Sequence, residues 1–335
     1  MRAAAALTIV GVLQLGTGGA ASAAEPTDIT IVAGSAPLLV SNAKKNGGAE
    51  RVERIAATFD RQNFSVVYCL NVTLRVDPSS PHAESGWADT GAPNLGKVLW
   101  ILNHSYPKVP AETVLEAAHA EALPVHGPIM TVYAATQVAI WQLADPENFQ
   151  YPDQPASGDD RLKTIVDYLL NNATEQAEPA FQQLSVTPAT HSGASGTKVG
   201  PYRVPTTIAG QAELRVIEGD GKIVDEQGGE LNRAGNGDVF YLTSNRTGVV
   251  RASLEAKATI PVGRTLARKA NPGGSQRLIL ATELAKPVSA QAEARFEATL
   301  PVTGASIGVL LAVAAGSVAA GMALIHLARR RRMAV

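Results

Sequence analysis

The chain has 335 residues, of which 29 are Lys or Arg and 30 are Asp or Glu, so its formal net charge is −1. Five of the basic residues lie near the two ends, which leaves 24 basic against 30 acidic residues between them. This balance argues against a nucleic-acid-binding protein, because such proteins need a basic surface. The length exceeds one ordinary hydrophobic core, so we expect two domains.

The first 24 residues have the pattern of a secretory signal peptide. Arg2 precedes an apolar run that extends from Ala3 to about Leu15, and small residues follow up to Ala24. The apolar run is too short to cross about 30 Å of hydrocarbon as a membrane anchor. We therefore expect residues 1–24 to be removed on export, by cleavage near Ala23 or Ala24.

Residues 25–185 have the mixed pattern of an α+β domain. Strand-like runs occur at 27–41 and 63–76. Helical patterns occur at 109–123, 130–145 and 157–173, and the stretch 96–107 fits a short helix or a strand. The inward face of the helix at 157–173 is predicted to consist of Leu162, Ile165, Val166 and Leu169. The inward face of the helix at 130–145 is predicted to consist of Val132, Ala135, Ala139, Ile140 and Leu143.

The rest of the exported chain is predicted to be β-rich. Residues 186–200 are small and polar and indicate a linker. Residues 201–286 contain short β-branched runs between Gly, Asp and Asn turns, which predict an all-β, immunoglobulin-like sandwich. We expect residues 287–299 to be an extended spacer. Lys198, Lys222 and Asn236 raise the possibility of an isopeptide cross-link in the sandwich, but no convincing partner occurs near its C-terminal end, and an ordinary spacer domain is favoured.

The last 36 residues combine three features in a fixed order. Leu300-Pro301-Val302-Thr303-Gly304 precedes an apolar stretch from Ile307 to Leu327, and four arginines follow. The apolar stretch is long enough to be one transmembrane helix with a cytoplasmic basic stop. The whole segment, 300–335, resembles the LPxTG sorting signal of Gram-positive surface proteins. The resemblance implies that a sortase cleaves between Thr303 and Gly304 and joins Thr303 to peptidoglycan, so that the mature protein is anchored to the cell wall.

Cys69 is the one cysteine of this exported chain, so an intramolecular disulfide is impossible. Four interpretations are open: a buried inert thiol, an intermolecular disulfide, a nucleophile with His104 or His126 as base, and a sulfur bonded to another side chain of the same protein. The apolar strand around Cys69 offers no basic neighbour or helix N-terminus that would lower the pKa of the thiol.

Gln137 is an unusual residue in the apolar helix at 130–145. It lies on one stripe with Tyr133, four residues before it, and Trp141, four residues after it. A buried Gln needs hydrogen-bond partners for both its carbonyl and its amine. If Cys69 attacks the Gln137 side-chain carbonyl and expels ammonia, a thioester remains, and aromatic neighbours would exclude water from it.

The segments Tyr68-Cys69-Leu70 and Thr136-Gln137-Val138-Ala139-Ile140-Trp141, together with Trp100, Tyr106 and Pro107, closely resemble the Cys-Gln thioester domain of Gram-positive surface adhesins. The resemblance covers residues 30 to 183. It implies that Cys69 is the thioester sulfur and Gln137 the acyl donor. It also implies one acyl transfer to an amine, most simply a lysine on a target surface, and not enzymatic turnover.

Residues that could assist the acyl transfer are chosen only because they lie near Cys69 or Gln137 in the sequence. His126, His104 and Tyr133 are candidates for a base or an oxyanion donor, although each is favoured as a structural residue. His82 is predicted to be an exposed loop residue. No pattern for a cofactor or metal site is present.

Two functions from different classes are therefore open. The first is a sortase-anchored adhesin with a Cys69-Gln137 thioester. The second is a non-covalent envelope binding or spacer protein in which Cys69 is a free buried thiol.

Overall fold

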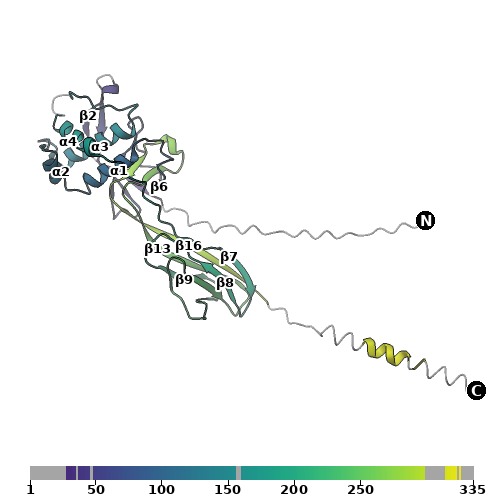
Figure 1. Cartoon of the computed structure of the whole chain (residues 1–335). Helices are drawn as coiled ribbons and strands as arrows, with labels where there is room; N and C mark the ends of the chain where they lie inside the picture. The colour runs from purple at the N-terminus through teal and green to yellow at the C-terminus, as the bar shows by residue number, and fades with distance from the viewer. Residues whose placement is uncertain are drawn as a thin grey trace, which may run out of the picture. The chain divides into compact units, whose positions relative to one another are not determined.

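The computed structural model describes residues 28–34, 37–45, 48–155, 160–298, 314–322 and 324–325. The predicted signal peptide and Leu300–Gly304 lie outside the described residues. Residues 314–322 and 324–325 are helical, and no helix among the described residues has the length and hydropathy needed to cross a bilayer. Met1–Phe296 form one compact unit and Glu297–Val335 another. All strands with assigned partners and two hydrophobic cores belong to the first unit (Figure 1).

The first core is built on an antiparallel six-stranded sheet with the order β1-β4-β5-β15-β14-β6. Its strands are β1 (Thr30–Ala33), β4 (Ile55–Thr58), β5 (Ser65–Cys69), β15 (Leu278–Leu280), β14 (Thr265–Arg268) and β6 (His82–Ser85). A separate hairpin consists of β2 (Leu38–Ser41) and β3 (Ala49–Val52). Short 3-10 turns occur at Ala43–Lys45 and Pro272–Gly274.

Four helices pack in the first core, around α3. They are α1 (Leu95–His104), α2 (Ala111–Ala117), α3 (Gly127–Ala144) and α4 (Asp160–Asn172). The stretch that fitted either a helix or a strand is therefore the helix α1. The four apolar residues predicted to face inward on α4 are its buried residues, which confirms that prediction.

The predicted one-sided burial of α3 is wrong. Every residue from Thr131 to Trp141 is buried, whereas Leu143, predicted to face inward, is only partly buried. The reason is that α3 contacts α1, α2, α4 and β5, so neighbours cover it on several sides. Alanines at 134, 135 and 139 let these neighbours approach closely, because a methyl group leaves room for the adjoining side chains.

The second core lies between two antiparallel sheets. One has the order β10-β12-β8, and the other has the order β11-β9-β13-β16-β7. The strands are β7 (Thr190–Ala194), β8 (Lys198–Arg203), β9 (Ala212–Glu218), β10 (Lys222–Val224), β11 (Arg233–Ala234), β12 (Val239–Thr243), β13 (Gly248–Ile260) and β16 (Leu284–Glu297). Tyr202, Phe240 and Phe296 are the largest side chains of this core.

Two segments predicted to be irregular are strands. The expected linker at 186–200 contains β7 and the start of β8. The expected spacer at 287–299 lies mostly in β16, which pairs with β13 along its whole length. Ala290, Ala292, Ala294 and Phe296 alternate as buried residues there. Period-two burial by alanine gives only a weak strand signal, because alanine is depleted in strands.

Two separate stretches of the chain contribute to the first core. After β13, residues 260–284 leave the second core, form β14 and β15 in the six-stranded sheet, and return as β16. The linear range 201–286 therefore includes strands of both cores. Pairings of β15 with β5 and of β14 with β6 span about 200 residues of sequence, and a local pattern does not reveal such contacts.

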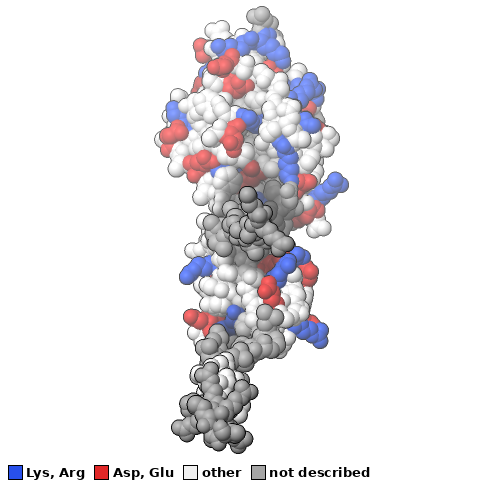
Figure 2. Space-filling view, turned by 90° about the vertical axis from the view of Figure 1, so that its right-hand side faces the viewer, with Lys and Arg blue, Asp and Glu red and all other residues white. Residues whose placement is uncertain are grey.

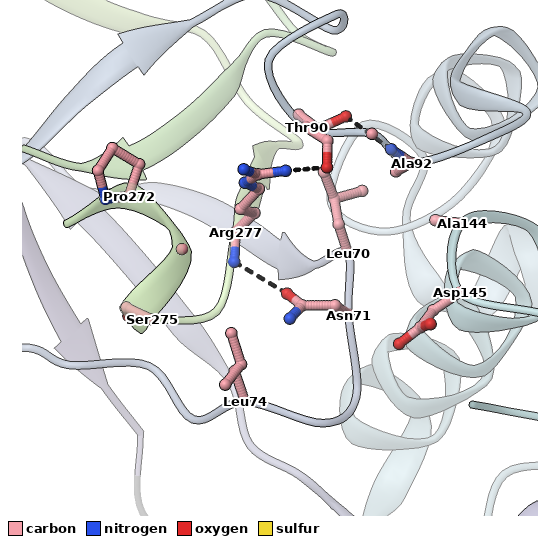
Figure 3. A pocket seen from close by; sticks show the side chains of 12 residues that line it. Leu70, Asn71, Leu74, Thr90, Ala92, Ala144, Asp145, Pro272, Ser275 and Arg277 are labelled. Carbon is pink, nitrogen blue, oxygen red and sulfur yellow. Dashed lines mark hydrogen bonds between the residues drawn. The ribbon is translucent and has the colours of Figure 1, made fainter. Parts of the chain in front are cut away.

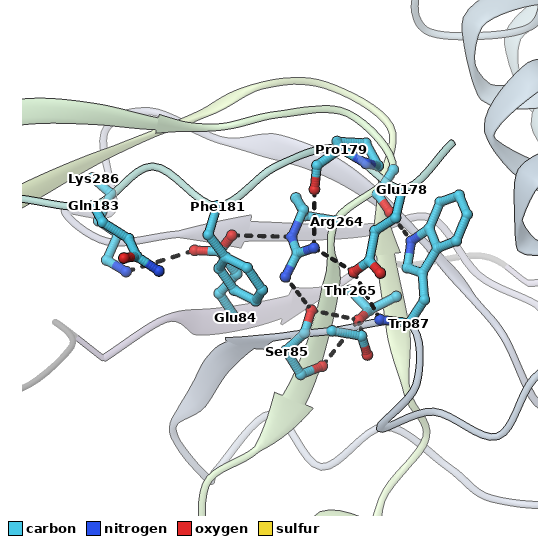
Figure 4. Close-up of polar contacts among 12 residues, drawn as sticks. Glu84, Ser85, Trp87, Glu178, Pro179, Phe181, Gln183, Arg264, Thr265 and Lys286 are labelled. Atoms are coloured by element: carbon cyan, nitrogen blue, oxygen red, sulfur yellow. Dashed lines mark hydrogen bonds and ion pairs between the residues drawn. The ribbon is translucent and has the colours of Figure 1, made fainter. Parts of the chain in front are cut away.

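Arg264 joins the segments where the chain passes between the cores (Figure 4). Its side chain is 1% exposed, and it donates hydrogen bonds to Glu84, Glu178, Pro179 O and Ser85 O. The guanidinium also lies 3.3 Å from the centroid of the Phe181 ring. The buried charge is thus matched by two carboxylates and an aromatic face, as a buried Arg requires.

Candidate functional site

The site begins where β4 and β5 separate. Ile55 and Val67 are register partners, but the Tyr133 hydroxyl of α3 lies between them. It accepts a hydrogen bond from Ile55 N at 3.2 Å and donates one to Val67 O at 2.9 Å. A side chain therefore replaces a direct backbone bond of the ladder and holds the two strands apart at this point.

Gln137 occupies the next position along the same gap. Cys69 N donates to Gln137 Oε1 at 2.8 Å, and Gln137 Nε2 donates to Cys69 O at 2.7 Å. The adjacent Leu70 N is bonded to Arg277 O, towards β15. Backbone groups of successive strand residues face opposite edges, so those of Cys69 face the side that β4 has left. The Gln137 amide fills the place of a missing strand residue.

Helix and strand spacings explain why these two side chains serve two backbone positions. A step of four residues along a helix advances about 6 Å, and a step of two residues along a strand advances about 6.6 Å. Tyr133 and Gln137 are one such step apart on α3, and Val67 and Cys69 are one such step apart on β5. Further along, Asp145 Oδ2 accepts a hydrogen bond from Val72 N at 2.8 Å, so the residue that follows α3 is bonded to the segment that follows β5.

The two hydrogen bonds place the Gln137 amide beside the backbone of Cys69. Both bonds are to the backbone of one residue, so they hold Gln137 Cδ opposite Cys69 Cα, the atom that bears the Cβ–Sγ arm. Cys69 is 5% exposed and Gln137 is 1% exposed. The Cys69 N–H is already directed at the oxygen that becomes negative when a nucleophile adds to Cδ, which is the geometry of an oxyanion donor.

The surroundings of the sulfur disfavour a free thiolate. Burial, and secondly the negative charge of Glu53, raises the pKa of the Cys69 thiol well above its usual range. A thioester carries no charge on sulfur, so this environment tolerates it better than a thiolate. Tyr68 and Tyr133, both buried, stack with ring centroids 4.5 Å apart beside the pair. Trp141 packs against Phe149 one helical turn beyond Gln137.

The predicted assistants have different positions. Tyr133 contacts the site, but its hydroxyl is committed to Ile55 and Val67, so it separates the strands. His126 is exposed at the N-cap of α3, eleven residues or about 16 Å along the helix from Gln137. His104 is exposed; it stacks on Trp100, and its Nδ1 lies 2.7 Å from Trp100 O. The structure does not bring either histidine to Gln137.

His82 is not an exposed loop residue as predicted. It lies in β6, is 0% exposed, and pairs with Arg268 of β14. Nδ1 lies 2.9 Å from Ser80 O, whereas the buried Nε2 has no hydrogen-bond partner within the described chain. Burial is the main cause that lowers the pKa of His82. The Pro and Ser residues before it resemble a loop, but pairing with a distant strand decides its conformation.

A pocket of about 290 Å³ lies next to the site (Figure 3). Leu70 and Asn71, which follow Cys69, form one wall, and Ala144 and Asp145 at the end of α3 form another. Arg277 closes a third side, where its backbone N donates to Asn71 Oδ1 and its guanidinium donates to Thr90 O. Neither Cys69 nor Gln137 lines this pocket, so it does not open directly onto the sulfur. No cluster that could hold a metal ion occurs among the described residues.

A comparison with protein families gives one match, which includes this arrangement. Residues 66–175 match the thioester domain family. The matched range contains both Cys69 and Gln137, and it includes β5 and all four helices of the first core. The first core of this chain also uses β14 and β15, which lie outside the matched range.

Solved structures give weaker likenesses. The thioester domain of the Enterococcus faecium TIE86 protein is 14% identical, with a TM-score of 0.41, over 84% of this chain and 100% of that chain. The Bacillus anthracis TIE protein is 15% identical, with a TM-score of 0.37, over 81% of this chain and 49% of that chain. An N-terminal thioester domain from Clostridium perfringens is 16% identical, with a TM-score of 0.28, over 47% and 83%. A comparison with curated proteins gave no match.

Proposed function

We propose that this protein is a bacterial surface adhesin in which Cys69 and Gln137 form an internal thioester that captures an amine on a target surface. The observation that supports it most strongly is the paired hydrogen bonding of the Gln137 amide to the backbone of Cys69. A family match over both residues supports it independently.

The first step is the formation of the thioester. Cys69 Sγ attacks Gln137 Cδ, the thiol proton passes to the departing nitrogen, and ammonia leaves. Oε1 keeps its hydrogen bond from Cys69 N throughout, which stabilises the negative charge that develops on it. Loss of Nε2 takes away the hydrogen bond to Cys69 O, whereas the Gln137 carbonyl keeps the hydrogen bond from Cys69 N.

The second step is the capture of a target. A primary amine adds to Cδ, the Cδ–Sγ bond breaks, and an amide joins Gln137 to the target. Because the pKa of the Cys69 thiol is raised, the departing sulfur takes up a proton, which disfavours the reverse attack. The reaction consumes the protein once, so it is acyl transfer without turnover.

Anchoring is the second part of the proposal. Leu300, Pro301, Thr303 and Gly304 form the sorting pattern, and they lie outside the described residues. A sortase would cleave after Thr303 and attach it to peptidoglycan, so that both ends of the connection are covalent. On the face shown in Figure 2, acidic and basic side chains are interspersed, and no single-sign patch dominates.

Labelling with a tagged primary amine tests the capture step. Residues 28–298, which contain both cores, are incubated with biotin-cadaverine, and the modified peptide is identified by tandem mass spectrometry. The expected result is a label on Gln137 that is absent from Cys69→Ala. Labelling that persists in Cys69→Ala, or no label together with an alkylatable thiol, would favour the non-covalent envelope protein with a free cysteine.

A further inference from the structure

Glu53 lies across the gap from Cys69. The register of β4 and β5 pairs Ile55 with Val67. Continued two residues past Ile55, the first paired residue of β4, this antiparallel register sets Glu53 opposite Cys69. Residues that lie opposite each other in such a pair are on the same face. The Gln137 amide fills the backbone gap between these two positions.

Contacts of the neighbouring residue support this placement. Side chains alternate along an extended segment, so Arg54 belongs with the face of Tyr68 and Glu53 with that of Cys69. Arg54 Nη2 lies 3.4 Å from the Tyr106 hydroxyl, and the Tyr68 hydroxyl donates to Tyr106 O. The charge of Arg54 acts on the Tyr68 hydroxyl, and the charge of Glu53 acts on the Cys69 thiol. Electrostatics and register therefore agree.

Glu53 is also the part of this site that solvent reaches. Its side chain is 30% exposed, and it forms an ion pair with Arg51 at 2.7 Å, whereas Cys69 and Gln137 are almost fully buried. The side chain of Arg51 is 53% exposed, so this ion pair lies at the surface. Solvent therefore reaches the Glu53 carboxylate and barely reaches Gln137.

We propose that Glu53 receives the protonated amine of the target and thereby makes the thioester selective for cationic primary amines. This inference rests on the proposed thioester and adds a substrate class to it. The carboxylate binds R–NH₃⁺ and accepts one proton from it, which frees the nitrogen lone pair for attack on Gln137 Cδ. The C–N bond forms and the C–S bond breaks. Of the two protons the nitrogen loses, one passes through Glu53 to water and the other ends on Cys69 sulfur.

The test compares charged and uncharged nucleophiles on Glu53→Gln. Nα-acetyl-lysine amide is a cation at neutral pH, whereas hydroxylamine is uncharged, and the loss of free thioester is followed by intact mass. General-base assistance typically contributes at least about a hundredfold; because Glu53 is partly exposed, we expect the lysine rate to fall by about tenfold or more. The hydroxylamine rate is expected to change by less than about twofold, as for an unassisted neutral nucleophile. Glu213→Gln, the same change on an exposed strand of the second core, is the matched control.

Three outcomes are distinguishable. A selective loss with the lysine amide supports the role of Glu53. An unchanged lysine rate, or an equal loss with both nucleophiles, overturns it and leaves the proposed function intact. A wild-type chain that never loses ammonia overturns the proposed function itself. If Glu53→Gln does not form the thioester, the salt dependence of the wild-type rates is measured instead. Added salt is expected to slow the reaction with the lysine amide and not the reaction with hydroxylamine, and a salt-independent lysine rate overturns the role of Glu53.

Discussion

Tyr133→Phe tests whether the Tyr133 hydroxyl stabilises the separation of β4 and β5. The substitution keeps the ring stacked on Tyr68 but removes the hydroxyl that serves Ile55 N and Val67 O. Each buried backbone group left without a partner costs about 1–3 kcal/mol. The two strands recover part of this if they move together, so we expect the free energy of unfolding to fall by about 2–4 kcal/mol.

Tryptophan fluorescence in urea measures this loss in the correct core. All three tryptophans, Trp87, Trp100 and Trp141, pack in the first core, so their signal does not report on the second. The variants are made in a Cys69→Ala chain, so that a cross-link contributes nothing. Tyr168→Phe is the control, because its hydroxyl forms no hydrogen bond with the described part of the chain and the residue packs at the edge of the same core. A Tyr133→Phe chain as stable as the control would show that the hydroxyl does not stabilise the separated strands.

Three further outcomes follow from the structure. Arg264→Met leaves Glu84 and Glu178 without their buried cation, so we expect the free energy of unfolding to fall by about 3–5 kcal/mol. We also expect faster proteolysis near residue 180. The control Arg215→Met, on the exposed face of β9, should change neither. Because burial lowers the pKa of His82, the unfolded chain takes up a proton at a higher pH than the folded chain does, so stability should decline as pH falls from about 7 to 5. His82→Gln should flatten that decline, and an unchanged slope would contradict it. Gln137→Ala should leave a thiol that iodoacetamide alkylates only after unfolding, since burial raises its pKa; rapid alkylation of the folded variant would show that Cys69 is accessible.

The sequence singled out Gln137 and Cys69 by local features, and the resemblance to the thioester domain of surface adhesins paired them. Tyr133, Gln137 and Trp141 lie on one helical stripe, and a buried amide needs partners wherever the helix packs. The strand alternation around Cys69 is also a local property. The structure adds that the partners of Gln137 are the N–H and C=O of Cys69 itself.

The remaining features depend on contacts that sequence spacing does not encode. Glu53 precedes Cys69 by sixteen residues and becomes its neighbour only through the register of β4 and β5. The strands β14 and β15 enter the first sheet after an excursion through the second core. Tyr133 was predicted as a candidate base or oxyanion donor. Its role between β4 and β5 depends on which backbone groups face its hydroxyl, and that is a property of the assembled sheet.

Intact mass of residues 28–298 tests the central claim most directly. We expect a mass one ammonia below that calculated from the sequence, with no free thiol in the folded chain. We further expect that Cys69→Ala and Gln137→Ala each have their full calculated mass. A wild-type chain at its full calculated mass, with Cys69 alkylated once the chain is unfolded, would contradict the thioester.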